Sequence, residues 1–299
     1  MIANHFTKPS TYKEAVKHKE WRQAMVEEYQ AVIDNNTWKL VDCPSNVKPI
    51  GCKWVYIIKY NQKGELEKYK TRLVVKGFAQ QEGIDYEETF APTAKWNTIR
   101  LTLALATQKG WKVHQMDVKS AFLNGDLQEE VYMTQPPGFE VEGQEHKVCK
   151  LIKALYGLKQ APRAWYAKMD EYLKKVGFQR SKSDDTLYVR QQGKYLVILV
   201  MYVDDLIITG NHDDHIAQVK KELHAGFKMT DLRLLHYYLG VEVFQRPHHI
   251  FISQSKYAAE VLQRFGMQDC KPVLTPMEKN LKLSKFEGGE RWTVQLTDS

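Results

Sequence analysis

Long apolar runs are missing from this chain, although hydrophobic residues make up 43% of its 299 residues. The longest stretch without a charged residue falls far short of the roughly 20 apolar residues that a membrane-spanning helix needs. The first residues also lack the basic and apolar regions of a signal peptide. These absences argue against a membrane protein and a secreted one, and we expect a globular, intracellular, cytoplasmic protein.

Cysteine is scarce as well. Cys43, Cys52, Cys149 and Cys270 are the four in the chain, and no two of them form a Cys-x-x-Cys pair. This spacing supports neither a disulfide framework nor a zinc knuckle, so we expect reduced thiols. The chain contains no internal repeat, and its length allows a sizeable core divided into two or three subdomains.

Acidic residues are few between Lys48 and Gln80. This segment contains eight basic residues, and its acidic residues are Glu65 and Glu67. Most of the net charge of +7 lies in this segment. A solvated face is one interpretation of such a run, and a phosphate-binding surface is the other.

Hydrophobic periodicity predicts alternating helices and strands. Thr11 and Glu14 have the spacing of a capping box. Helices are expected over residues 11–34, 97–108 and 161–175, after Gly210, and over residues 256–265. Strands are expected over residues 37–41, 53–59, 68–76 and 111–118, twice within 195–210, and over 238–244 and 250–253. Residues 61–64 should form the turn of a basic hairpin, and a loose tail should begin near Pro272.

The stretch from Asn211 to His215 contains two histidines and two aspartates, which are possible metal ligands. Asp213 or Asp214 is equally able to cap the helix that carries Ile216. Capping needs fewer assumptions, and we prefer it to a metal site.

Asp204 and Asp205 interrupt the otherwise apolar stretch 195–210. Two adjacent carboxylates repel each other, and burying an unpaired charge costs several kcal/mol. A bound cation removes this cost. Mg²⁺ prefers oxygen ligands and is commonly held by one or two carboxylates together with substrate phosphates. A hairpin whose turn happens to use two aspartates is the alternative explanation.

A two-metal site for phosphoryl transfer needs a further carboxylate. Asp117 is the candidate, because it lies near the end of the apolar strand 111–118 and is compatible with a neighbouring position in the same sheet.

Many stretches of the chain, in order, resemble the reverse transcriptase region of Ty1/copia-type retrotransposons, particularly those of plants. The resemblance covers about residues 11 to 277. The matching stretches are Trp38 and residues 51–56, 69–78, 83–92, 115–125, 132–139, 155–165, 202–205, 238–243 and 265–272.

This resemblance implies an α+β fold of the right-hand polymerase type, with fingers, an antiparallel-sheet palm and a partial thumb. The implied divisions are an N-terminal helical segment (1–36), mainly fingers (37–116), mainly palm (117–245), a partial thumb (246–277) and a loose tail (278–299).

The resemblance also assigns site residues. Asp117, Asp204 and Asp205 match the catalytic, metal-binding carboxylates. Nucleotide-binding positions match Lys59, Arg72, Phe122, Tyr156 and Gly157, with Phe122 under the sugar, where it excludes a 2′ hydroxyl. The primer-gripping strand matches Gly240, Val241, Glu242 and Val243. For Phe122 and Tyr156, ordinary core packing is the competing interpretation.

The implied activity is RNA-directed and DNA-directed DNA synthesis with two Mg²⁺ ions, for which Mn²⁺ is a possible substitute. The implied partners are an RNA or DNA template with its primer, and deoxynucleoside triphosphates. A virus-like particle or the nucleus is the alternative location.

The chain departs from the family pattern at Thr71, at Val75 and over residues 290–299. An intact element is expected to include integrase and ribonuclease H parts, and we expect this chain to be a fragment without them. A catalytically inactive, truncated nucleic-acid-binding remnant is therefore the alternative function.

Overall fold

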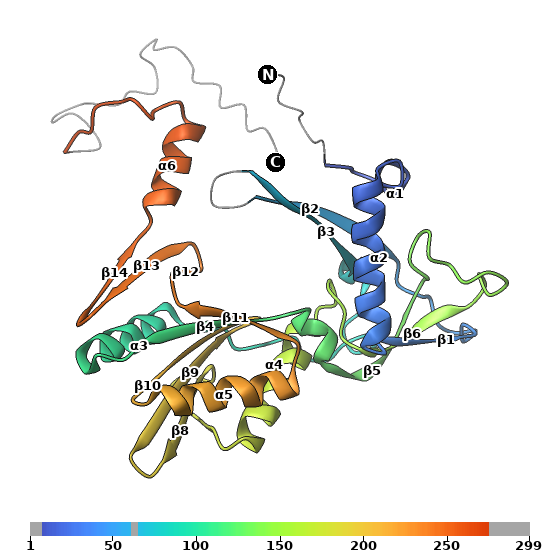
Figure 1. Ribbon diagram of the computed structural model, residues 1–299. Coiled ribbons are helices and arrows are strands. Elements are labelled where there is room, and N and C mark those ends of the chain that lie inside the picture. The colour runs from blue at the N-terminus through green and yellow to red at the C-terminus, as the bar shows by residue number, and fades with distance from the viewer. Residues whose placement is uncertain (1–7, 61–64, 275–299) are drawn as a thin grey trace, which may run out of the picture. The chain divides into compact units, whose positions relative to one another are not determined.

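The computed structural model describes residues 8–60 and 65–274. The chain divides into two compact units, Met1–Ser253 and Gln254–Ser299. Within the described part of the second unit lies one helix, α6 (Ser255–Arg264). The first unit mixes helices with antiparallel sheets (Figure 1), which confirms the mixed helix and strand class expected from the sequence.

A six-stranded antiparallel sheet forms the centre of the first unit. Its strand order is β11 (Met229–Leu234), β4 (Val113–Val118), β10 (Asp205–Gly210), β9 (Tyr195–Tyr202), β8 (Leu187–Gln192) and β7 (Gln179–Arg180). The chain thus folds back between β9 and β10, and β4 lies on the other side of β10.

Both faces of this sheet are covered. On one face, α4 (Ala161–Lys175) and α5 (Asp213–Gly226) pack against residues such as Leu199 and Leu206. On the other face, α3 (Trp96–Lys109) and a small sheet pack against residues such as Val200 and Ile207. The small sheet consists of β12 (Tyr237–Tyr238), β13 (Val241–Arg246) and β14 (His249–Ser253). Because side chains alternate along a strand, two covered faces explain the continuous apolar run.

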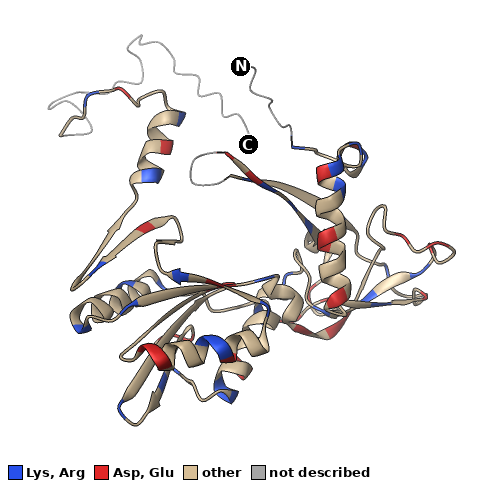
Figure 2. Cartoon of the chain, viewed as in Figure 1, with Lys and Arg blue, Asp and Glu red and all other residues tan. Residues whose placement is uncertain are grey.

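The N-terminal part surrounds a second core. Helices α1 (Tyr12–Ala15) and α2 (Lys19–Asp34) precede a three-stranded sheet of β1 (Trp38–Val41), β6 (Val148–Lys153) and β5 (Asp126–Met133). The hairpin of β2 (Cys52–Tyr60) and β3 (Leu66–Val75) packs against α2. Short 3₁₀ turns, η1 (Gly77–Ala79) and η2 (Ala121–Asn124), complete it. Figure 2 shows basic residues on this hairpin.

Most of the predicted helices and strands are confirmed, and α4 has the predicted bounds. The single helix over 11–34 is wrong. α1 ends at Ala15, and His18 has an extended backbone before α2 begins. The break is held by Arg22, whose Nη1 donates a hydrogen bond to the carbonyl oxygen of Val16 at 2.8 Å.

The predicted cap of α5 is also wrong, because His212 is the N-cap residue and makes no side-chain capping bond. Asp213 lies in the first turn and instead pairs with Lys112, at 2.6 Å between Nζ and Oδ2. Its charge still favours the positive end of the helix. The ring of His215 stacks on Tyr195, with centroids 4.0 Å apart.

The strand predicted over 238–244 is divided. Leu239 and Gly240 have φ of 49° and 82°, which forms a tight turn between β12 and β13. The predicted turn at 61–64 and the predicted tail over 278–299 lie outside the described residues. The cysteines are free thiols, as expected. No helix in the described part of the chain is long and apolar enough to cross a membrane.

Candidate active site

Asp117, Asp204 and Asp205 meet at one end of the central sheet. Asp117 is the penultimate residue of β4, and Asp205, the first residue of β10, lies directly opposite it in the antiparallel register. Asp204 occupies the turn that joins β9 to β10. Neighbouring strands therefore bring together carboxylates that are distant in sequence, as the spacing predicts.

The turn that carries Asp204 is strained and is held by hydrogen bonds from two other elements. Val203 has φ of 54°, a left-handed conformation that costs a non-glycine residue about 1–2 kcal/mol. The indole Nε1 of Trp165, on α4, donates a hydrogen bond to the Val203 carbonyl oxygen at 2.7 Å. The backbone N–H of Val118 donates to the Asp204 carbonyl oxygen at 2.8 Å. This support retains the strained turn, a feature that is common at functional sites.

Burial and repulsion from neighbouring carboxylates change the acidity of Asp117 and Asp205. Burial, followed by repulsion from Asp204, raises the pKa of Asp117. Burial is also the main reason that the pKa of Asp205 is raised, and the charges of Asp204 and Asp117 add to it. The carboxylates are close enough to disfavour one another's charge, so a cation placed among them would be strongly attracted.

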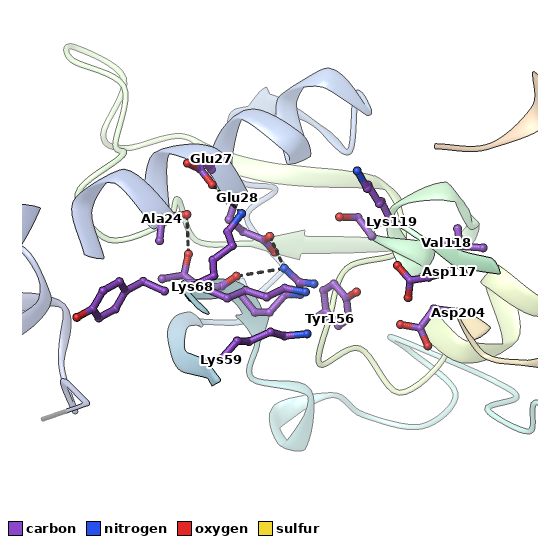
Figure 3. Close-up of a pocket in the computed structure, with 15 residues that line it drawn as sticks. Ala24, Glu27, Glu28, Lys59, Lys68, Asp117, Val118, Lys119, Tyr156 and Asp204 are labelled. Atoms are coloured by element: carbon purple, nitrogen blue, oxygen red, sulfur yellow. Dashed lines mark hydrogen bonds and ion pairs between the residues drawn. The ribbon is translucent and has the colours of Figure 1, made fainter. Parts of the chain in front are cut away.

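A cavity of about 360 Å³ opens beside this end of the sheet. Asp117 and Asp204 line one side, where their carboxylates point toward each other, and Lys59 reaches in from the opposite side (Figure 3). Fifteen residues from α2, the β2–β3 hairpin, β4 and the loops line it: Ala24, Glu27, Glu28, Lys59, Lys68, Tyr69, Lys70, Thr71, Arg72, Asp117, Val118, Lys119, Ser120, Tyr156 and Asp204.

The hairpin presents cations to this cavity. Lys68, Lys70 and Arg72 occupy alternate positions of β3, so they share one face of the strand, and Lys59 lies opposite Lys68 in the register. Burial, together with the charges of Arg72 and Lys59, lowers the pKa of Lys70 to about 8. A cavity with carboxylates on one side and crowded cations on the other suits a metal-bound polyphosphate.

Arg72 is held from two sides. Its Nη1 donates a hydrogen bond to Oε2 of Glu28 at 2.9 Å, and its guanidinium lies over the Tyr156 ring, 5.0 Å from the centroid. The Tyr156 carbonyl oxygen accepts a hydrogen bond from the N–H of Val75 at 2.7 Å. The loop that contains Tyr156 is therefore bonded directly to β3.

Gly157 allows this close approach. Its φ is 92°, and an added Cβ would lie 2.1 Å from the carbonyl oxygen of Val75. Gly157 does not itself line the cavity. Its position is explained by the packing of the loop on β3, which brings Tyr156 to Arg72.

Phe122 lies outside the cavity and contacts Tyr156, with ring centroids 4.9 Å apart. It lines a neighbouring apolar cavity of about 410 Å³, together with Phe90, Trp165 and Val203. Phe122 is half-buried and packs against the two larger cores. One side of the Phe122 ring is therefore packed against the cores, and another side of the ring borders the neighbouring cavity.

The segment Gly240–Val243 divides between a turn and a strand. Gly240 lies in the β12–β13 turn, whereas Val241 and Val243 are buried, and Val243 belongs to the core on the α3 side of the sheet. Glu242 Oε2 accepts a hydrogen bond from Ser253 Oγ at 3.1 Å. The part of this segment accessible to another molecule is therefore the turn and the Glu242 side.

The donor set suits a hard cation, although the described residues contain no group of three or more His, Cys, Asp or Glu side chains arranged to hold a metal. Asp205 is instead engaged by Gln115, whose Nε2 donates to Oδ1 at 2.9 Å. Mg²⁺ keeps several waters and takes one or two carboxylates plus phosphate oxygens. The facing pair of Asp117 and Asp204 fits that requirement.

Comparison with known proteins identifies the family. The family described as "Reverse transcriptase (RNA-dependent DNA polymerase)" matches residues 35–279, which is most of the chain. The chain belongs to the reverse transcriptase family. The matched range includes the central sheet, the hairpin and all three aspartates.

Proteins similar to the chain include long polyproteins of plant transposons. The chain is 46% identical over 293 residues to the "Retrovirus-related Pol polyprotein from transposon RE1" of Arabidopsis thaliana, covering 98% of this chain and 20% of that protein. It is 45% identical over 283 residues to the corresponding polyprotein from transposon TNT 1-94 of Nicotiana tabacum, covering 93% and 21%. The chain spans about a fifth of these relatives and corresponds to their copia-type reverse transcriptase domain.

Glu28, Lys70 and Gln115 are among the residues of the cavity and its surroundings that were not predicted as site residues from the sequence. Lys70 could have been predicted, because Lys68, Lys70 and Arg72 alternate along one strand and so share a face. Glu28 and Gln115 carry no motif of their own, and only the tertiary structure brings them to Arg72 and Asp205.

Proposed function

We propose that this chain is a DNA polymerase module that copies RNA, and also DNA, by adding deoxynucleotides to the 3′ hydroxyl of a primer. The observation that carries the proposal is the cavity in which Asp117 and Asp204 face Lys59, Lys70 and Arg72. Membership of the reverse transcriptase family supports the reaction class.

Asp117, Asp204 and Asp205 are the proposed ligands of two Mg²⁺ ions, with Mn²⁺ as a possible substitute. Such ions supply Lewis-acid chemistry, because they lower the pKa of an attacking hydroxyl and stabilise charge on the transferred phosphate. The chain's own contribution is a rigid turn that keeps the Asp204 side chain beside Asp117. Gln115 donates a hydrogen bond to the Asp205 carboxylate and so fixes it, and Asp205 pairs with Asp117 in the register of the two strands.

Lys59 and Arg72 bind the triphosphate in this proposal, and Lys70 joins them because it lies on the same face of β3 as Arg72. Each supplies positive charge on the side of the cavity away from the carboxylates. Tyr156 stacks on Arg72 and limits its movement, and Gly157 lets the Tyr156 loop approach the strand. Donors fixed in advance stabilise developing negative charge without the cost of reorganisation.

Phe122 is the proposed wall beneath the sugar, where its ring would clash with a 2′ hydroxyl. Its contact with Tyr156 supports this role, because it places the ring directly behind a cavity-lining residue. The segment Gly240–Val243 is the proposed primer grip, acting through the turn at Gly240 and the half-buried Glu242.

The elements are assigned to a right-hand polymerase in the same proposal. Residues 37–116 are mainly fingers, 117–245 mainly palm and 246–277 a partial thumb, after the N-terminal helical segment 1–36. The partners are an RNA or DNA template with its primer, and deoxynucleoside triphosphates. The relatives' names describe Pol polyproteins, which supports other polyprotein parts as partners in an intact element. The resemblance implies that these parts are integrase and ribonuclease H.

Template-primed incorporation of labelled deoxynucleotides tests the proposal. The chain is incubated with Mg²⁺ and a primer annealed to RNA, or to DNA of the same sequence. We expect labelled, primer-extended products on both templates. Binding of the primer–template without any extension would instead support the inactive nucleic-acid-binding alternative.

A further inference from the structure

Glu28 is a buried acid at the edge of the cavity, and its helix lies outside the family-matched residues. The side chain is 5% exposed and belongs to α2, which ends at Asp34, whereas the family match begins at residue 35. α2 nevertheless contributes Ala24, Glu27 and Glu28 to the cavity wall. A helix that precedes the matched segment thus forms part of the site.

Both oxygens of the Glu28 carboxylate are used to hold β3. Oε2 accepts the hydrogen bond from Arg72 Nη1 at 2.9 Å, and Oε1 accepts one from the backbone N–H of Leu73 at 3.4 Å. Nearby, Thr71 Oγ1 donates to the Ala24 carbonyl oxygen at 2.8 Å. These contacts fix the position of β3 relative to α2 at the residues that carry the cation.

The contacts of Arg72 restrict its position but do not use every N–H group of its guanidinium. The hydrogen bonds to Glu28 and to the Thr71 carbonyl oxygen both come from Nη1. They leave the remaining N–H groups of the fork for other acceptors. Tyr156 covers one face of the group, so Arg72 is directed along the cavity wall while its side chain remains 17% exposed.

Glu28 and Arg72 each stabilise the charged form of the other. Burial raises the pKa of Glu28, and the charge of Arg72 opposes that rise. Removing one partner of a buried ion pair leaves an uncompensated charge, which is strongly destabilising. An exposed pair such as Lys68 with Glu27, at 3.3 Å, contributes little by comparison.

We propose that Glu28 is a positioning residue of the nucleotide site, which holds Arg72 ready for the triphosphate of the incoming nucleotide. The inference rests on the proposed function, because it takes the triphosphate as the ligand of Arg72. It adds α2 to the elements that form the nucleotide site. The advantage of a fixed arginine is that its rotamer entropy is lost on folding rather than on binding.

Steady-state incorporation of a single deoxynucleotide by the full chain tests the role. Glu28→Gln keeps the shape and removes the charge that holds Arg72, so the KM for the nucleotide should rise about tenfold, a loss of about 1.4 kcal/mol. The kcat and the affinity for primer–template should change much less. Glu20→Gln is the matched control, because it removes one exposed acid from the same helix and should behave as wild type.

A double-mutant cycle separates positioning from a general loss of stability. Arg72→Lys should raise the KM by itself, and adding Glu28→Gln to it should cause little further rise. Melting temperatures report stability independently. If Glu28→Gln folds poorly, Glu28→Asp, which keeps the charge on a shorter side chain, should give an intermediate KM. A KM unchanged in folded Glu28 variants, or effects that simply multiply, would overturn the inference.

Binding of inorganic tripolyphosphate, measured by calorimetry in metal-free buffer, distinguishes this inference from the proposed function. Wild type should bind tripolyphosphate about tenfold more tightly than Glu28→Gln. Should wild type bind it in this Glu28-dependent way and yet synthesise no DNA, the polymerase proposal fails and the positioning role stands. Equal binding by both proteins contradicts the positioning role, whatever the polymerase assay shows.

Discussion

Replacing Asp204 by asparagine should remove DNA synthesis and preserve the fold. The turn depends on the backbone of Asp204, whose carbonyl oxygen accepts the bond from Val118, and on the Trp165 bond to Val203. Neither bond uses the Asp204 side chain. Asparagine has almost the same shape and tolerates turn positions well. The change therefore removes one charge from the cavity and little else.

The size of the effect follows from the position of that charge. Asp204 is one of the two aspartates that line the cavity. Removing one group that stabilises transition-state charge in a preorganised site costs about 2.7–4 kcal/mol, or roughly 10²- to 10³-fold in kcat. We expect at least this loss for Asp204→Asn.

The same substitution should stabilise the protein in metal-free buffer. Asp204 raises the pKa values of Asp117 and Asp205, in addition to the larger effect of burial. A carboxyl group with a raised pKa binds its proton more readily in the folded state, so it destabilises the fold at pH values above its titration. Relief of about 1 kcal/mol raises the melting temperature by about 2 °C at pH 7. The gain should shrink as the pH falls through the titration of these groups.

Primer extension under single-turnover conditions measures the first effect, and thermal melting in EDTA measures the second. Glu171→Gln, which removes one exposed carboxylate that does not line the cavity, controls for general changes of charge. Extension by Asp204→Asn at a rate near that of wild type would refute the assignment of this side chain. A lower melting temperature at pH 7 would refute the account of its repulsion.

Three further predictions concern the walls of the site. Phe122→Ala should increase ribonucleotide incorporation relative to deoxynucleotide incorporation, and an unchanged ratio would assign Phe122 to packing alone. Gly157→Ala should destabilise the fold by about 2–5 kcal/mol in urea unfolding, because its Cβ would meet the Val75 oxygen at 2.1 Å. Gly193→Ala, with φ of 59° and nothing within 4 Å, is the control for backbone strain and should cost about 1–2 kcal/mol. Nucleotide binding favours charged Lys70, whose pKa is about 8, so KM should rise above that pH and Lys70→Arg should flatten the profile.

Much of the central sheet could be predicted because periodicity and burial agree there. The run 195–210 predicted two strands, and the structure adds that the strands are covered on both faces. Other strands were not predicted, since their patterns are weak. β5 begins with Asp126 and contains two adjacent glutamates, and β11 is interrupted by a bulge between Asp231 and Arg233. Their strand character comes from pairing with neighbours.

The carboxylates were predictable because adjacent aspartates in an apolar strand require an explanation, and Asp117 had a matching position. The contacts of the basic side chains in the cavity could not be predicted from the sequence. Glu28 follows another glutamate on a helix and looks like a solvated side chain, yet it is buried against β3. Nor did the sequence indicate that Asp213 would pair with Lys112 instead of capping its helix. Both outcomes depend on partners from other elements.

Sequencing the products of primer extension on a defined RNA template tests the central claim most directly. The account predicts that the folded chain, with Mg²⁺ and all four deoxynucleotides, makes DNA complementary to the template. It also predicts that Asp117→Asn makes none while binding the same primer–template. A folded wild-type chain that binds the primer–template without extending it, or an Asp117→Asn variant that copies it as wild type does, would contradict the account.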